Sequence, residues 1–92
     1  MTNYKRLTNT NVKDVILNVC KKHNNMHKPS GFVIADHDNH KSISLVYYRG
    51  YNNINALMDI CIDIECTLRN TFNDVEVFAC ACVPDDVPVC SL

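Results

Sequence analysis

Three residues of this chain, Cys20, His23 and His27, have types and a spacing that could bind a metal, since they follow the pattern C-x2-H-x3-H. Thiolate and imidazole groups are zinc ligands, and Cys20 and His23 would lie one turn apart on a helix. However, Cys20 also falls in an apolar stripe that would turn it toward a core. Histidines in polar loops need no special explanation in a chain with four of them. We therefore expect no bound metal or cofactor, and zinc binding by these residues stays an alternative.

Catalysis is the second chemistry to consider. A cysteine and a histidine can act as nucleophile and base, but only where the thiol pKa is depressed and the pair lies within hydrogen-bonding distance. Asp36, His37, Asp38 and His40 could supply acid and base groups, yet Asp and Asn also suit a turn between strands. We expect no catalytic site, and a small enzymatic or metal-binding domain remains an alternative.

The six cysteines could form a disulfide framework in a secreted protein. Cys20 and Cys61 fall in apolar stripes of predicted helices, where a reduced thiol behaves as a small hydrophobic group. Residues 1–12 are too polar for a signal peptide, and no apolar run approaches the roughly 18 residues that cross a bilayer. We expect reduced thiols and a cytoplasmic protein, in the host cytoplasm if the source is a virus.

The first half of the chain predicts a helix and then a hairpin. Apolar residues recur at helical spacing from Val12, and polar residues that can cap a helix precede them. The stripe comprises Val12, Val15, Ile16, Val19 and Cys20, and the candidate caps are Asn9, Thr10 and Asn11. Two β-prone runs follow, at 32–35 and 42–48, separated by turn-forming residues at 36–41. Antiparallel pairing is the expectation for this hairpin.

The second half predicts a longer helix and one more strand. The expected core stripe of the helix is Ile54, Leu57, Met58, Cys61, Ile64, Leu68 and Phe72. Ile60 and Ile62 widen the apolar sector beyond what one sheet face would cover. The strand, at 75–83, is apolar on both sides after Glu76, which favours a central or covered position. Residues 84–92 contain two prolines, and we expect an irregular tail.

These elements predict a single small α+β domain with the order α-β-β-α-β. The expected architecture is a three-stranded, mainly antiparallel sheet packed against two helices. Residues 1–9 would form a basic polar arm, 10–83 the core and 84–92 the tail. Ninety-two residues leave little core, and the second helix has surplus apolar surface, so we also expect a homodimer.

Charge is divided by position along the chain. Residues 1–50 hold eight Lys and Arg and three acids, a formal +5, whereas 51–92 hold one Arg and seven acids, a formal −6. Fields of one sign steer encounters with charged partners. We predict an acidic contact face formed by Asp59, Asp63, Asp74 and Glu76. We also predict a basic face formed by Lys5, Arg6, Lys21 and Lys22.

The function that accounts for most of these features is protein recognition without catalysis. Tyr47, Tyr48 and Tyr51 add aromatic contacts of the kind found at interface hot spots. The small size and Asn-rich composition fit a viral or phage accessory protein that inhibits or adapts a larger protein. A DNA mimic or a nucleic-acid-binding regulator is the main alternative. The isoelectric point of about 6.4 and the absence of a known binding motif argue against direct nucleic-acid binding, and the seven acids of the second half would suffice for a mimic only if a dimer doubled them.

Overall fold

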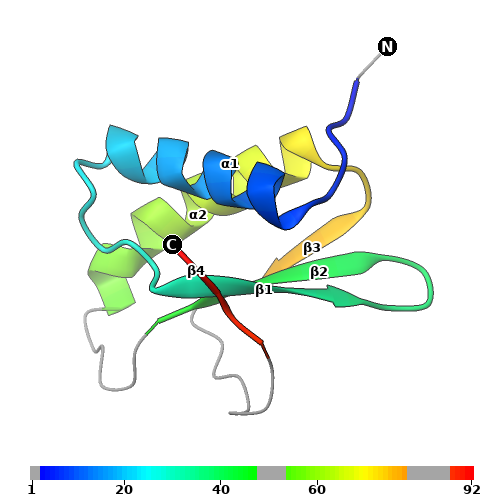
Figure 1. Cartoon of the computed structure of the whole chain (residues 1–92). Coiled ribbons are helices and arrows are strands. Elements are labelled where there is room, and N and C mark those ends of the chain that lie inside the picture. Colours follow the sequence, from blue (N-terminus) through cyan, green and yellow to red (C-terminus); the bar gives the residue numbers. More distant parts are fainter. Residues whose placement is uncertain (1–2, 48–53, 79–87) are drawn as a thin grey trace.

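Two helices lie against one face of a four-stranded mixed sheet in the computed structural model, which describes residues 3–47, 54–78 and 88–92. The element order is α-β-β-α-β-β, and the strands are arranged β3-β2-β1-β4 across the sheet. The helices run antiparallel to each other above the sheet (Figure 1). The predicted α+β class and the order of its first five elements are confirmed. The sheet has one more strand than expected.

The first helix, α1, spans Asn9–Lys22 and buries every residue of the predicted stripe. Its N-cap is Thr8, whose side-chain oxygen accepts a hydrogen bond from the backbone N–H of Asn11 at 3.1 Å. The expected caps, Asn9 to Asn11, are therefore wrong, because the helix begins at the first of them and the cap precedes it. The preceding arm contacts the second helix through the Lys5 N–H, which donates to the carbonyl of Thr71 at 2.9 Å.

The predicted hairpin is confirmed as β1, Gly31–Asp36, and β2, Lys41–Val46. The strands pair antiparallel, with Phe32 opposite Leu45 and Ile34 opposite Ile43. The sheet residues in or against the core all come from alternating positions that face the helices. These residues are Phe32, Ile34, Ile43, Leu45, Tyr47, Val75, Val77, Cys90 and Leu92.

The second helix, α2, spans Ile54–Thr71 and connects β2 to β3, Val75–Phe78. Because α2 forms a crossover connection, β3 returns parallel to β2, with Val77 beside Ile43. Within the described strands β3 lies at one edge of the sheet. Of the two predicted alternatives, a central or a covered strand, the central position is not found among the described strands, and the covered one stays a prediction. Residues 79–83 of the predicted strand lie outside the described residues.

The last residues form β4, Cys90–Ser91, which pairs antiparallel with Gly31 and Phe32 of β1. The prediction of an irregular tail is wrong for these residues, and residues 84–87 lie outside the described part. A Cβ atom on Gly31 would come within 2.6 Å of the Cys90 carbonyl oxygen, so glycine permits this close approach. None of the helices in the described ranges has the length and apolar character needed to span a membrane.

Candidate interaction surface

The outward face of α2 carries a row of apolar side chains that the fold leaves in solvent. Met58 and Ile62 are 53% and 52% exposed, and Cys66, four residues further along, is also exposed. This i, i+4, i+8 spacing places the three side chains along one side of the helix. By contrast, Leu57, Ile64 and their neighbours in the inward stripe are almost fully buried. We call Met58, Ile62 and Cys66 the α2 row.

The exposure of Met58 in the α2 row corrects the predicted core stripe of this helix. Met58 was expected in the core and is exposed, whereas Ile60 is 1% exposed and belongs to it. A helix that packs against both a sheet and a second helix buries a wider sector than one that packs on a sheet alone. The surplus apolar surface predicted for this helix is therefore located at Met58 and Ile62.

Asp63, one of the predicted acidic contacts, bridges the two helices. Its Oδ2 lies 2.9 Å from Nε2 of His23, and its Oδ1 lies 3.6 Å from Nζ of Lys22. The hydrogen bond to His23 lowers the pKa of Asp63, burial opposes this shift, and the charge of Lys22 adds to it. We call this arrangement the Asp63 clasp. Because the clasp uses Asp63, its carboxylate is less available to an external partner than the sequence indicated.

Asp59, one turn earlier, is exposed and forms no ion pair with the described residues. It lies beside Met58 and Ile62 of the α2 row. Asp74 and Glu76 lie elsewhere. Both line an open polar pocket of about 510 Å³ at the start of β3, beyond the far end of α2. The four acids therefore do not form one face.

The polar pocket also involves the turn between β1 and β2. Nε2 of His40 lies 3.3 Å from Oε1 of Glu76. The His37 and His40 rings stack with their centroids 4.7 Å apart, and Nε2 of His37 lies 3.0 Å from Oγ of Ser42. These contacts join the turn to β2 and β3. They give the polar residues of the turn a structural role, in line with the interpretation of this segment as a turn.

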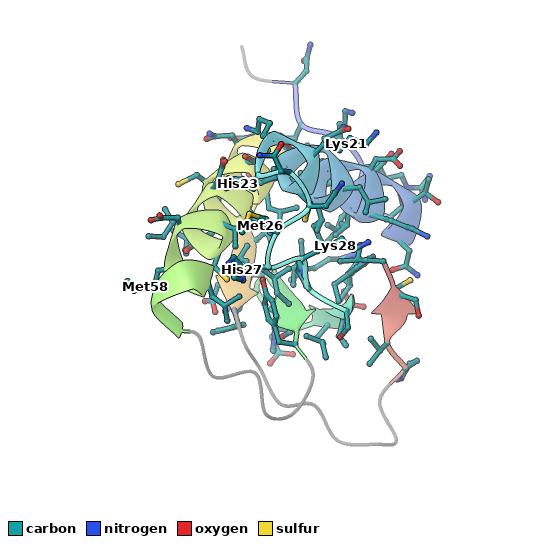
Figure 2. All side chains as sticks on the ribbon, turned by 90° about the vertical axis from the view of Figure 1, so that its left-hand side faces the viewer. Lys21, His23, Met26, His27, Lys28 and Met58 are labelled. Atoms are coloured by element: carbon teal, nitrogen blue, oxygen red, sulfur yellow. The ribbon has the colours of Figure 1, made fainter. Side chains whose placement is uncertain are left out.

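The predicted basic residues are also divided. Lys5 and Arg6 precede α1, whereas Lys21 and Lys22 occupy its last turn, about 20 Å away along the 14-residue helix. The view in Figure 2 shows Lys21 and Lys28 on one end of the molecule, around the exposed side chain of Met26. Because the two basic pairs lie at opposite ends of α1, they do not form one continuous phosphate-binding surface.

The sequence did not single out Met26, which is 59% exposed in the loop between α1 and β1. Asn24, Asn25 and His27 of this loop adopt positive φ angles of 57°, 57° and 58°. Asparagine and histidine tolerate this left-handed region better than most residues. The run Asn24-Asn25 was the one available signal that a tight, defined loop would present Met26.

The structure describes one of the three predicted aromatic contacts, Tyr47, and its partner-binding role stays a prediction. Tyr47 is half-buried, and its hydroxyl donates to the carbonyl of His27 at 2.9 Å and lies 3.6 Å from Sγ of Cys61. It therefore ties the α1–β1 loop to the core. Tyr48 and Tyr51 lie outside the described residues.

The candidate zinc ligands do not converge. Cys20 is fully buried in the core, where burial raises the pKa of its thiol and the charge of nearby Lys28 partly opposes that shift. His23 belongs to the Asp63 clasp. Across residues 3–47, 54–78 and 88–92, no group of three or more His, Cys, Asp or Glu residues is placed to hold a metal ion.

Comparison with known proteins does not add to this picture. No protein family, curated protein or solved structure matches the chain.

Proposed function

We propose that this protein is a non-enzymatic interaction module that binds another protein chain through the α2 row. The observation that carries the proposal is that Met58 and Ile62 stay more than half exposed, although the same helix buries Leu57, Ile60, Ile64 and Leu68. Exposed apolar residues gathered on one helix face are typical of binding sites. A function in which the protein inhibits or adapts a larger protein follows from this proposal.

The charged residues around the α2 row indicate what kind of partner surface would complement it. Asp59 lies beside Met58 and Ile62, and α2 as a whole carries three acids, Asp59, Asp63 and Glu65, against the single base Arg69. Glu65 and Arg69 pair with each other at 3.2 Å, and the clasp uses Asp63. A partner segment with an apolar core and a basic residue at its border would complement this surface.

The free energy gained by burying the α2 row determines how much additional surface a stable interface needs. Full burial of a Met or Ile side chain contributes about 1.5–3 kcal/mol, and these two are already about half buried, so each adds roughly 1 kcal/mol. The loss of translational and rotational freedom on association costs about 4–15 kcal/mol. The row therefore serves as an anchor within a larger interface. The same limit applies to the predicted homodimer, whose interface must extend beyond α2.

Photo-cross-linking tests the proposal for a partner of any identity. Benzoylphenylalanine replaces Ile62 in the full chain, and the matched control carries it at Lys13, an exposed position on α1. We expect a discrete cross-linked product from position 62 in the expressing cell, and its loss when Met58→Lys is added. The mass of the product separates a second copy, at twice 10.5 kDa, from a different protein.

Equal labelling from positions 62 and 13 would contradict the proposal. Charge steering is tested with Asp59→Asn, which should slow association and reduce its salt dependence. Asp63 is left unchanged in this experiment, because its replacement would also disturb the packing of the helices.

A further inference from the structure

The outer edge of β1 is longer than the strand that covers it. β1 has six residues, Gly31–Asp36, whereas β4 pairs only with Gly31 and Phe32. In Figure 1, β4 crosses β1 obliquely and β1 continues past it toward the β1–β2 turn. Within the described residues, the segment from Val33 to Asp36 has no strand on this side.

The hydrogen-bond pattern shows which backbone groups are exposed on this edge. The N–H of His37 donates to the carbonyl of His40, so the odd-numbered residues of β1 direct their backbone groups toward β2. The N–H of Leu92 donates to the carbonyl of Ser30, so the even-numbered residues face the β4 side. The N–H and C=O groups of Ile34 and Asp36 therefore point outward, without a backbone partner in the described part of the chain.

Pro88 explains why the pairing of β4 with β1 does not begin earlier in the chain. The register that pairs Phe32 with Cys90 would pair Ile34 with residue 88. Proline has no N–H to donate to the Ile34 carbonyl, so regular pairing cannot continue. The carbonyl of Ile34 is thus an acceptor that residue 88 cannot satisfy.

A pocket of about 180 Å³, lined mostly by apolar residues, lies beside this exposed edge. It is lined by Asn9, Phe32, Val33, Ile34, Pro88, Val89 and Cys90. A residue docked opposite Ile34 would direct its side chain to the same side as Ile34, toward α1. The pocket therefore suits one aliphatic side chain of an added strand.

Asp36 sets the charge preference of the next outward position. Its side chain is 78% exposed, although Lys41 lies 3.4 Å away. A basic residue directly across from it would form a favourable cross-strand pair. In an antiparallel strand this residue comes two positions before the aliphatic one.

We propose that the β1 edge at Val33–Asp36 binds an extended segment of another protein in antiparallel register, with the pattern basic-x-aliphatic near the end of the bound segment. The basic residue lies opposite Asp36 and the aliphatic residue opposite Ile34. A second copy of β1 fits poorly, because two-fold pairing centred on Ala35 places Asp36 of the copy opposite Ile34, beside the mostly apolar pocket. This surface is separate from the α2 row, so the two proposals stand independently.

Amide hydrogen exchange on the full chain tests the edge itself. We expect the amides of Ile34 and Asp36 to exchange rapidly, while those of Val33 and Ala35, bonded to β2, are protected. Protection of all four amides in the free protein would show that the edge is already occupied and would overturn the proposal.

Binding is tested by NMR titration with the peptide acetyl-Ser-Thr-Lys-Thr-Ile-amide. We expect shifts at Ile34 and Asp36 and at least a fivefold slowing of exchange at their amides. The matched control peptide carries an N-methyl group on its isoleucine, which removes the donor to the Ile34 carbonyl and should abolish both effects. Equal responses to the two peptides, or none to either, would refute the proposal.

A charge-reversing substitution at Asp36 tests the register of the bound peptide. Asp36→Lys should weaken binding of the lysine peptide and favour the same peptide with glutamate at that position. Asp36→Lys removes the exposed pair with Lys41 and places two lysines opposite each other, so circular dichroism must first show that the variant is folded. An unchanged preference between the two peptides would refute the assigned register.

Discussion

Replacement of Asp63 by asparagine tests whether the two helices are joined electrostatically. The carboxylate contacts His23 at 2.9 Å and Lys22 at 3.6 Å, and it accepts a hydrogen bond from Thr67 at 3.4 Å. Hydrogen bonds to charged groups contribute about 1.5–3 kcal/mol, whereas exposed ion pairs contribute about 0.2–1 kcal/mol. Because about a third of the Asp63 side chain is exposed, we expect Asp63→Asn to lower the free energy of unfolding by about 1 kcal/mol at pH 7.

The pH dependence of this loss follows from the lowered pKa of Asp63 in the folded protein. The stabilisation is fully present above the unfolded-state pKa, about 3.9. It is lost as the pH falls through the lower folded-state pKa. The difference between Asp63→Asn and the natural protein should therefore be present at pH 7 and disappear in strong acid.

Urea unfolding followed by circular dichroism, at neutral pH and in acid, measures this difference. Asp59→Asn is the matched control, since Asp59 lies one turn away on α2 and forms no ion pair with the described residues. Its free energy of unfolding should change by less than about 0.5 kcal/mol. Equal losses for the two variants, or a loss for Asp63→Asn that persists in strong acid, would refute the assigned role of the clasp.

Four further substitutions test the fold. Gly31→Ala should displace β4 and speed amide exchange there, because the new Cβ would meet the Cys90 carbonyl at 2.6 Å; unchanged exchange would contradict this. Ile64→Ala should lower the free energy of unfolding in urea by about 2–5 kcal/mol. Ile62→Ala should lower it by less than about 1 kcal/mol, and similar losses for the two variants would place Ile62 in the core. Thr8→Ala should cost about 1 kcal/mol through loss of the α1 cap, and no loss would place the cap elsewhere.

Local patterns predicted the helices and the hairpin well, because each depends on neighbours a few residues apart. The apolar stripe of α1, from Val12 to Cys20, is buried as expected. The boundary of α1 was missed because Thr8 competes with three other polar residues that can also cap a helix. Met58 was misplaced because periodicity alone does not show where the neighbouring helix lies.

Long-range pairing could not be predicted from these patterns. Nothing local indicates that β3 returns parallel beside β2, or that Cys90 reaches Phe32 at the opposite edge. The Asp63 clasp joins residues 40 positions apart, so it too depends on how the helices pack. The separation of Asp59 from Asp74, by contrast, follows from the length of α2 alone, since Asp59 lies in its second turn and Asp74 beyond its end.

The charge division between the two halves of the chain is partly neutralised within the fold. Lys22 and His23 of the basic half contact Asp63 of the acidic half, and His40 contacts Glu76. The electrostatic field available to steer a partner is therefore smaller than the formal charges of the two halves indicate. Steering and docking can coincide only where an unpaired charge lies beside exposed apolar surface. Asp59 satisfies both conditions at the α2 row, whereas Asp36 at the β1 edge is paired with Lys41 at 3.4 Å. If a partner binds at either proposed surface, we expect it to carry a basic residue close to an aliphatic one, and this expectation restricts the candidates more than net charge does.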